Sequence, residues 1–494
     1  MSYQNLVQRF TQLHHFAHLG AICGWDRATM MPEGGNEARA AALAELSLLM
    51  HQRLTAPEVA DWLAAAAQAP LSVAERQSLH EMQRQWQQAS VLPADLVQAK
   101  SLAGSRCEHA WREQRKNNDW QGFLTNFREV VALSREEARI RGAASGLRPY
   151  DSLLDLYEPG MNSARLDTLF ADLQSWLPAM IREVGERQRA ESVLAPQGPF
   201  PTAQQAALGR EVMALLQFDF QRGRQDVSVH PFCGGVPSDV RITTRYDEQD
   251  FTQSLMGIIH ETGHARYEQG LPLATLALPV GQARSMGIHE SQSLFFEMQL
   301  ARHPAFMGLL EPRIRQVFGE QPAFAAANLA GLYTRVEPGF IRVDADEVTY
   351  PTHVMLRYEV EQKLIEGVIE ADDIPDLWAQ RMQEYLGLDT RGNYRDGCLQ
   401  DIHWTDGSFG YFPSYTLGAM YAAQFAAALQ RDLGSFSTLL AQGDTGLAQV
   451  FDWLSRHVWQ QASLHDTDTL VRQATGEALN PVHFRRHLQQ RYLG

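Results

Sequence analysis

The chain has 494 residues, of which 45% are apolar and 20% are charged, so it belongs among globular proteins with a large core and not among disordered chains. Lys and Arg number 43 against 58 for Asp and Glu, which gives a formal net charge of −15. A surface of that sign repels phosphate backbones, so nucleic acid is not expected as a partner.

Helical periodicity dominates the chain from its start. Leu6, Phe10 and Leu13 recur at helical spacing, and Ala-, Leu-, Gln- and Arg-rich stretches continue the pattern through residues 36–145. Further helices are predicted at residues 160–190, 203–220, 249–269, 288–303, 352–370, 416–431 and 445–463. No linker-like or repeated segment divides the chain. We therefore expect a mainly α protein with one domain, residues 1–494, comprising an N-terminal helical region to about residue 200 and a second region from about residue 201, which contains the motifs described below.

Residues 226–246 interrupt the helical pattern. Val, Ile and Thr alternate there with polar residues, and Pro and Gly break the run. We predict a short hairpin or a small sheet just before the next helix. Such a strand could form one wall of a cleft and present its edge to an extended peptide.

The next predicted helix contains the motif H-E-x-x-H at His260, Glu261 and His264. Residues four apart on a helix lie on one face, so both imidazoles can reach the same ion. The apolar residues of the segment project on the opposite face, and Gly270 with Pro272 ends the helix. The pattern predicts a helix that packs with one face and binds a metal with the other.

A third ligand is needed, because catalytic zinc usually takes three protein ligands, often two His and one Glu, and keeps a position for water. Glu290 begins the next amphipathic segment and is the predicted ligand, with Glu297 as the alternative. His289 points about 100° away from Glu290 on a helix, so we expect it to face the substrate or to stand behind the ligands.

Glu261 lies between the two histidines of the motif. Bound zinc lowers the pKa of a water molecule to about 7. We predict that Glu261 is the general base that takes a proton from this water and passes it to the leaving amine. These residues predict a zinc-dependent peptidase with one ion per chain.

Six stretches occur in the order of a known family's motifs. They are HPF at 230–232, DVRIT at 239–243, HETGH at 260–264, HESQ at 289–292, IRVDAD at 341–346 and GCLQDIHW at 397–404. In these motifs, in GWDRATMMP at 24–32 and in total length, the chain resembles the carboxypeptidase Taq family of metallocarboxypeptidases. None of the six motifs departs from the family pattern.

The resemblance implies a mostly helical fold with a long substrate groove, which the N-terminal region covers. It implies a zinc or cobalt ion bound by His260, His264 and Glu290, and a homodimer. The implied activity is the release of single residues, with broad specificity, from peptides that have a free C-terminus.

A carboxypeptidase must recognise a free α-carboxylate, and the planar fork of an arginine makes paired hydrogen bonds to such a group. We assign this role to Arg342 in IRVDAD, with Arg241 in DVRIT as the second candidate. The alternative for each is an internal salt bridge, between Arg342 and Asp344 or Asp346, or between Arg241 and Asp239. For Arg241 this alternative is favoured.

The segment that follows GCLQDIHW supplies His403, Tyr411 and Tyr415 close together in the sequence. Peptide hydrolysis develops negative charge on the carbonyl oxygen, which positioned N–H and O–H donors stabilise. We assign this catalytic role to His403 and Tyr411, with a structural role as the alternative, which is favoured for Tyr415. His230 is a substrate-binding candidate, although the HPF motif could instead only shape the wall of the groove.

Two other functions compete with this interpretation. A zinc oligopeptidase or endopeptidase would use the same metal centre. A helical scaffold with a structural metal is disfavoured, because structural zinc sites usually close all four positions, often with cysteines. The four cysteines here are scattered without a CxxC pair, and no signal peptide or apolar membrane-spanning stretch is found. We expect a cytoplasmic protein without a membrane anchor.

Overall fold

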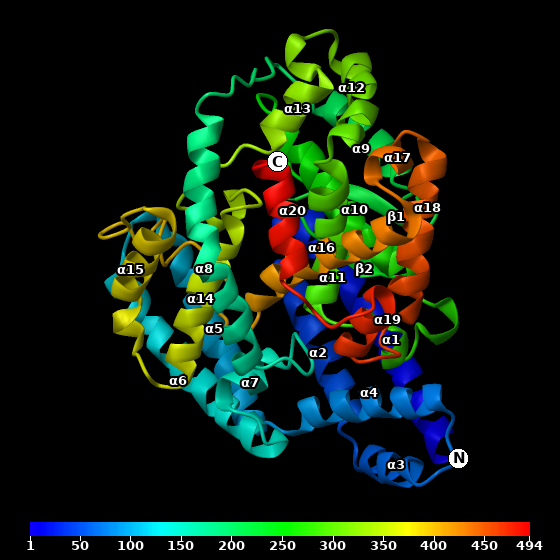
Figure 1. Cartoon of the computed structure of the whole chain (residues 1–494). Coiled ribbons are helices and arrows are strands. Elements are labelled where there is room, and N and C mark those ends of the chain that lie inside the picture. The colour runs from blue at the N-terminus through cyan, green and yellow to red at the C-terminus, as the bar shows by residue number, and fades with distance from the viewer. Residues whose placement is uncertain (229) are drawn as a thin grey trace.

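The computed structural model describes residues 1–228 and 230–494 and confirms a mainly helical fold (Figure 1). The N-terminal region consists of α1 (Ser2–Thr29), α2 (Asn36–Leu54), α3 (Pro57–Ala67), α4 (Val73–Ser90), α5 (Ala94–Lys116), α6 (Trp120–Ser145), α7 (Pro149–Leu154) and α8 (Ser163–Gln188). The middle contains α9 (Thr202–Leu215), β1 (Gly223–Val227), β2 (Cys233–Val236), β3 (Asp239–Thr244), α10 (Phe251–Gly270), α11 (Met286–Leu294), α12 (Pro304–Phe318) and α13 (Ala326–Tyr333). The C-terminal part contains α14 (Tyr350–Ile365), α15 (Ile374–Leu386), α16 (Pro413–Leu433), α17 (Phe436–Leu440), α18 (Asp444–His457), α19 (Thr467–Thr475) and α20 (Val482–Tyr492).

Of the two alternatives predicted for residues 226–246, a short hairpin or a small sheet, the structure has the small sheet, which begins slightly earlier, at Gly223. Its strand order is β1-β3-β2, with β3 in the centre. β2 and β3 form the antiparallel hairpin, whereas β1 pairs with β3 in parallel, with Gly223 opposite Val240. The chain between β1 and β2 passes to the other side of β3, a long-range pairing that strand alternation alone does not predict.

The sheet supports the helix that carries H-E-x-x-H. Val240 and Ile242 of β3 are fully buried and pack with Ile258 and Ala265 of α10 in one small core. The side chain of Asp250 caps the start of α10 by accepting a hydrogen bond from the Thr252 N–H, at 2.8 Å. The predicted packing face of α10 is therefore confirmed.

Helices α10, α11 and α16 lie in the middle of the molecule, with α5, α6, α8, α14 and α15 on one side and α17 and α18 on the other (Figure 1). Ser285 caps α11 by accepting a hydrogen bond from the Ile288 N–H, at 3.1 Å. The predicted helix at 288–303 is only partly α-helical, because residues Phe295–Ala301 form π-helical turns, which occur frequently at functional sites.

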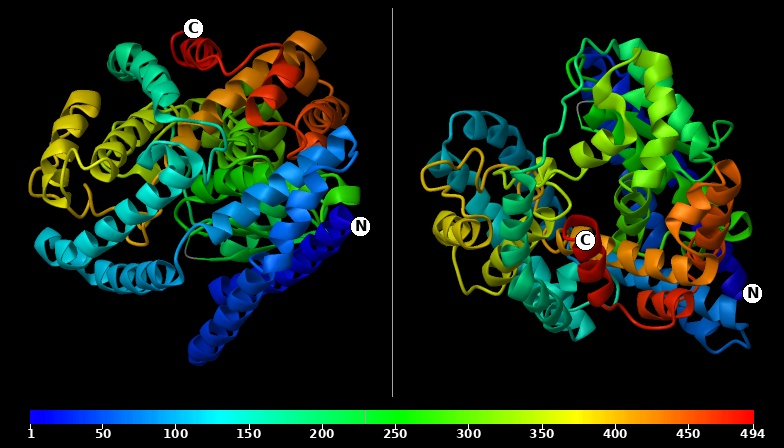
Figure 2. Two further views of the ribbon diagram at one scale, coloured as in Figure 1. Left: turned by 90° about the horizontal axis from the view of Figure 1, so that it is seen from below. Right: turned by 45° about the horizontal axis from the view of Figure 1, so that its top comes forward.

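The N-terminal helices form a core of their own. Leu6 and Phe10 of α1 pack with Val59 and Leu63 of α3 and with Met82 of α4. In Figure 2 the dark-blue N-terminal helices lie at the edge of the molecule, and α1 meets the small sheet through Trp25, which donates a hydrogen bond to Asp226 at 2.9 Å. Within the described part of the chain, no helix combines the length and the apolarity that a membrane span requires.

Candidate metal centre and active site

Two helices deliver the three predicted metal ligands to one place. His260 and His264 of α10 and Glu290 of α11 have ligand atoms that all lie within 4.8 Å of one another. His264 Nε2 is 3.4 Å from Glu290 Oε2. All three side chains are half-buried. Two imidazoles and one carboxylate fit a catalytic zinc ion, because this donor set leaves a coordination position for water.

Two glycines allow the close packing that this convergence needs. At Gly263 of α10, a Cβ atom would lie 2.6 Å from the Gln292 carbonyl oxygen on the next helix. At Gly418 of α16, a Cβ atom would lie 2.7 Å from both Cβ and Cγ of Glu290. Helix α11 therefore lies between two helices that approach it without a side chain, and Glu290 can reach the histidines.

His260 is oriented by a second carboxylate. Its Nδ1 lies 2.7 Å from Glu297 Oε2, and Arg302 binds the other oxygen of Glu297 at 2.5 Å. When Nδ1–H donates to Glu297, the Nε2 atom of His260 is left for a metal ion. Glu297, the alternative to Glu290, is thus engaged behind His260 and is not among the three converging ligands.

His264 is oriented by His289. The two Nδ1 atoms are 2.7 Å apart, and His289 Nε2 is 2.7 Å from Glu268 Oε1. Both contacts are satisfied when His289 donates from Nε2 to Glu268 and accepts from His264 at Nδ1, which leaves His264 Nε2 facing Glu290. Because both ring nitrogens of His289 are engaged, the structure favours the supporting role over the substrate-facing role.

Glu261 lies beside this cluster with only 7% of its surface exposed. Its Oε2 atom has no hydrogen-bond partner among the described residues. Burial raises the pKa of Glu261 to about 7, although the neighbouring His260 opposes the shift. A carboxylate with one unpartnered oxygen and a raised pKa is suited to accept a proton from a water molecule.

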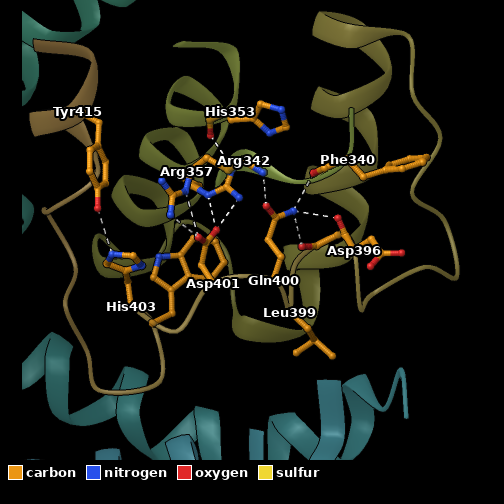
Figure 3. Close-up of polar contacts among 12 residues, drawn as sticks. Phe340, Arg342, His353, Arg357, Asp396, Leu399, Gln400, Asp401, His403 and Tyr415 are labelled. Carbon is orange, nitrogen blue, oxygen red and sulfur yellow. Dashed lines mark hydrogen bonds and ion pairs between the residues drawn. The ribbon is translucent and has the colours of Figure 1, made fainter. Parts of the chain in front are cut away.

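Arg342 lies in a buried cluster with Asp401 and Arg357 (Figure 3). Its Nε and Nη2 atoms donate to Asp401 Oδ1, at 3.0 and 2.9 Å, and Nη1 donates to the Tyr350 hydroxyl at 2.8 Å. Arg357 Nε donates to the second oxygen of Asp401, at 2.6 Å. Two guanidinium groups thus share one carboxylate, and the group carries one excess positive charge.

An internal salt bridge was the alternative role for Arg342, and Arg342 does form one, but with neither of the two partners named for it, Asp344 and Asp346. Asp344 is exposed, and Asp346 instead accepts hydrogen bonds from the Thr349 N–H and O–H groups just before α14. The actual partner, Asp401, comes from GCLQDIHW. Gln400 of the same motif holds the two segments together, because its Oε1 accepts the Arg342 backbone N–H at 2.7 Å.

A layer of tyrosines connects the arginine cluster with the metal centre. The rings of Tyr350 and Tyr415 are 6.0 Å apart, and those of Tyr415 and Tyr411 are 5.3 Å apart. Tyr415 lies three residues before Gly418, the residue of α16 that contacts Glu290. Burial, with the charge of Glu290 adding to it, raises the pKa of Tyr411 to about 12.

His403 joins the same layer. Its ring stacks on Tyr411 at 5.4 Å, and its Nε2 is 3.4 Å from the Tyr415 hydroxyl. Burial lowers the pKa of His403 to about 4, so its imidazole is neutral at pH 7 and carries one N–H donor. His403, Tyr411 and Tyr415 are therefore grouped by the fold as well as by the sequence.

The other two predicted residues, Arg241 and His230, lie in and beside the small sheet. Arg241 makes a bidentate ion pair with Asp239, at 2.9 and 2.6 Å, in agreement with the favoured alternative. His230 is exposed between β1 and β2, where its carbonyl oxygen accepts a hydrogen bond from Ser228. Within the described residues, neither makes a hydrogen bond to the three converging ligands or to the arginine cluster.

Comparison with known proteins agrees with this geometry. The model of the "Carboxypeptidase Taq (M32) metallopeptidase" family matches residues 5–492. Thermostable carboxypeptidase 1 of Thermus thermophilus is 37% identical, covering 99% of this chain and 98% of the relative. The solved structure of Trypanosoma cruzi metallocarboxypeptidase 1 superimposes with a TM-score of 0.98 at 47% identity, covering 100% of this chain and 99% of that chain. The M32 carboxypeptidase of Deinococcus radiodurans gives a TM-score of 0.92 at 31% identity, covering 99% and 98%.

The chain belongs to the carboxypeptidase Taq (M32) family. It is a metallocarboxypeptidase, and the family implies a divalent metal ion and peptide substrates.

Sequence reasoning missed several residues of this M32 site. Glu268 lies four residues after His264 on α10, so helical spacing would have placed it near the metal face. Asp401 lies inside a motif that was recognised for other residues. Arg357 and Tyr350 of α14 have no local signal, because their roles come from long-range contacts, of Arg357 with Asp401 and of Tyr350 with Arg342.

Proposed function

We propose that this M32 metallocarboxypeptidase releases single residues from the C-termini of peptides, with broad specificity, using one zinc ion held by His260, His264 and Glu290. The observation that carries the proposal is the convergence of these three side chains while both histidine Nδ1 atoms are engaged elsewhere. Cobalt would suit the same donors. Glu297 and His289 support the ligands from behind.

We assign the steps of peptide hydrolysis to a few residues. Zinc, when bound, supplies Lewis-acid chemistry, which polarises the scissile carbonyl and favours ionisation of water. Glu261 accepts the proton of the attacking water and delivers it to the leaving amine. The His403 N–H and the Tyr411 O–H donate hydrogen bonds to the carbonyl oxygen as its negative charge develops.

Arg342 binds the terminal carboxylate of the substrate in this proposal. Its side chain has five N–H donors, of which three are used by Asp401 and Tyr350, so 5 − 3 = 2 remain. Asp401 holds the guanidinium group of Arg342 in place. Arg357 pairs with the same carboxylate, so the cluster of two arginines and one aspartate keeps a net positive charge. The Tyr350 hydroxyl accepts from Arg342 and can donate its own proton to the same carboxylate.

The decisive experiment compares peptides that differ only at the C-terminus. Purified, zinc-loaded protein is incubated with matched free-acid and C-terminally amidated peptides, and the products are identified by mass spectrometry over time. We expect free acids to shorten one residue at a time and amides to resist. Equal cleavage of both forms, or internal cuts, would instead establish the oligopeptidase or endopeptidase alternative.

Removal and return of the metal tests the cofactor. A chelator should abolish turnover, and zinc should restore it. Elemental analysis of protein purified without added metal identifies the resident ion. Turnover that survives complete metal removal would contradict the proposal.

We also propose a cytoplasmic homodimer, in which the N-terminal region to about residue 200 covers a long substrate groove. No residue of α2 is buried, and Leu48 and Leu49 are exposed on it, so a second copy has an apolar surface to cover. The four free cysteines fit a reducing compartment. Light scattering should give twice the chain mass for the native protein and the single mass for Leu48→Glu. A native monomer would contradict the dimer.

A further inference from the structure

Glu158 is a buried carboxylate that no catalytic role explains. It lies in the turn after α7, in the N-terminal region, and is 1% exposed. Its Oε1 accepts hydrogen bonds from the Gly287 N–H and from the Ser414 hydroxyl, the latter at 2.9 Å. Within residues 1–228 and 230–494, no Lys or Arg forms an ion pair with it. Burial raises the pKa of Glu158 to about 7, although these donors and the charge of Arg284 oppose the shift.

The two donors lie at the starts of two different helices. Gly287 is the second residue of α11, and Ser414 is the second residue of α16. Unpaired N–H groups and aligned peptide dipoles make a helix N-terminus partly positive, so both ends attract an anion. One carboxylate thus joins the N-terminal end of α11, which carries Glu290, to that of α16, which packs against Glu290.

The joined ends are close to the metal centre. Glu290 lies three residues after Gly287, and Gly418, four residues after Ser414, contacts Cβ and Cγ of Glu290. A Cβ atom at Gly287 would lie 2.8 Å from Glu158 Oε1, so the carboxylate packs directly on the helix backbone. A shift of α11 against α16 would therefore move Glu290.

The neighbouring residue makes the same connection. The Tyr157 carbonyl oxygen accepts the Met286 N–H at 3.1 Å, just before Gly287. The Tyr157 ring packs edge-on against Tyr411, with 5.1 Å between ring centroids. The turn after α7 thus contacts both the start of α11 and the tyrosine layer.

We propose that Glu158 is a positioning residue for the metal centre, which holds the ends of α11 and α16 in register and thereby sets the place of Glu290. This inference rests on the proposed ligation of the metal by Glu290. It assigns to the N-terminal region a part in metal binding, although the ligands all come from residues 260–290.

The test is the metal affinity of Glu158→Gln in the full-length chain. The variant keeps the size of the side chain but replaces the anion with an amide. Metal-free protein is titrated with Zn²⁺ against a chelating dye, and the visible spectrum of the Co²⁺ form is recorded. We expect Kd for Zn²⁺ to rise about 10-fold to 100-fold, as for other residues that support metal ligands, and the Co²⁺ spectrum to change.

Asp151→Asn is the matched control. Asp151 is also buried and lies in α7, where it accepts the N–H of Ser163, the first residue of α8, at 2.7 Å. Helix α8 carries none of the proposed site residues. Asn keeps the Oδ1 atom that accepts the Ser163 N–H, so we expect this variant to lose the charge but not the hydrogen bond and to keep Kd for Zn²⁺ within about twofold.

An unchanged Kd and Co²⁺ spectrum in Glu158→Gln would overturn the proposal, and so would an equal rise of Kd in Asp151→Asn. If Glu158→Gln does not fold, Ser414→Ala removes one of the two hydrogen bonds, and its Kd must rise more than twofold. Glu290→Gln distinguishes a wrong ligand set from a wrong positioning role. If its Kd is unchanged, the ligand set fails and this proposal fails with it. If only Glu290→Gln weakens binding, the positioning role alone is wrong.

Discussion

His260 and His264 sit on one helix face but are held by different partners. Glu297 engages Nδ1 of the first, and His289, backed by Glu268, engages Nδ1 of the second. A hydrogen bond at Nδ1 sets the tautomer and the orientation of each ring, and Nε2 is then left for the proposed ion. Because the ring is already held in place, it loses little further rotational freedom when an ion binds. Glu297 and Glu268, which are not among the three proposed ligands, therefore help to set the orientation of the two histidines.

Glu261→Gln tests the general base. The amide keeps the size of the side chain but cannot accept the proton, so kcat should fall about 100-fold to 10,000-fold. The metal content, measured by elemental analysis, should stay at one ion per chain, because Glu261 is not among the three converging ligands. Full activity in this variant would exclude Glu261 as the base.

Arg342→Lys and Arg241→Lys decide which arginine holds the substrate carboxylate. A lysine at 342 cannot replace a fork that serves Asp401 and Tyr350 and still offers two donors, so KM for free-acid peptides should rise about 10-fold to 100-fold. Arg241 is already paired with Asp239, and its replacement should change KM less than about twofold. Steady-state kinetics with one peptide measures both, and the reverse pattern would assign the role to Arg241.

Packing between elements brings the ligands together. Helix α10 rests on β3 with one face and meets α11 with the other, and α16 closes the far side of α11. The approach at Gly263 and Gly418 is closer than any side chain permits. The glycine inside HETGH thus has a packing role, independent of the metal.

Gly263→Ala should show this role directly. The new Cβ would meet backbone atoms of Gln292 and Ser293 at 2.6 Å, which cannot rotate away, so we expect a loss of about 1–3 kcal/mol in the free energy of unfolding. Gly257→Ala on the same helix is the control, because no atom lies within 4 Å of its Cβ position. It should gain about 0.5–1 kcal/mol from helix propensity. Urea unfolding of both variants measures the difference; equal effects would contradict the packing role.

The C-terminal helix is tied to the rest of the molecule by one buried acid. Glu347, which follows IRVDAD directly, accepts hydrogen bonds from Arg491 at 3.0 Å and from the Tyr492 hydroxyl at 2.8 Å. Burial alone would raise the pKa of Glu347, but the charges of Arg491, His487 and Arg302 together outweigh it and hold the pKa well below its usual range. The last helix of the chain is therefore anchored close to the catalytic motifs.

Stability should depend on pH through this group. Because the pKa of Glu347 is depressed in the folded state, its stabilisation is fully present above the pKa of an unfolded glutamate, about 4.3, and is lost gradually as pH falls from that value through the lower folded pKa. Glu347→Gln should therefore cost about 3–5 kcal/mol at pH 7, and this cost should begin to fall below about pH 4, by about 1.4 kcal/mol per pH unit. Urea unfolding of both proteins between pH 3 and 7 measures this. Glu108→Gln, in an exposed pair with Arg112, is the control and should cost less than about 1 kcal/mol. A cost that stays constant with pH would contradict the assignment.

Local pattern determined much of this protein. The 3.6-residue period predicted most of the helices, the i, i+4 spacing predicted that His260 and His264 share a face, and the motif order predicted the family. These features depend on neighbours within a turn or two of the chain, or on short strings of residues. They can therefore be read without knowing how the chain folds.

Only the tertiary structure decided which residues form hydrogen bonds and ion pairs with one another at the site. His260 meets Glu297 across 37 residues, Arg342 meets Asp401 across 59, and Gly287 meets Glu158 across 129. The parallel pairing of β1 with β3 is of the same kind. Hydrogen bonds and ion pairs depend on atoms within a few ångströms, and which side chains reach that distance is set by how helices cross and pack, information that no local window of sequence contains.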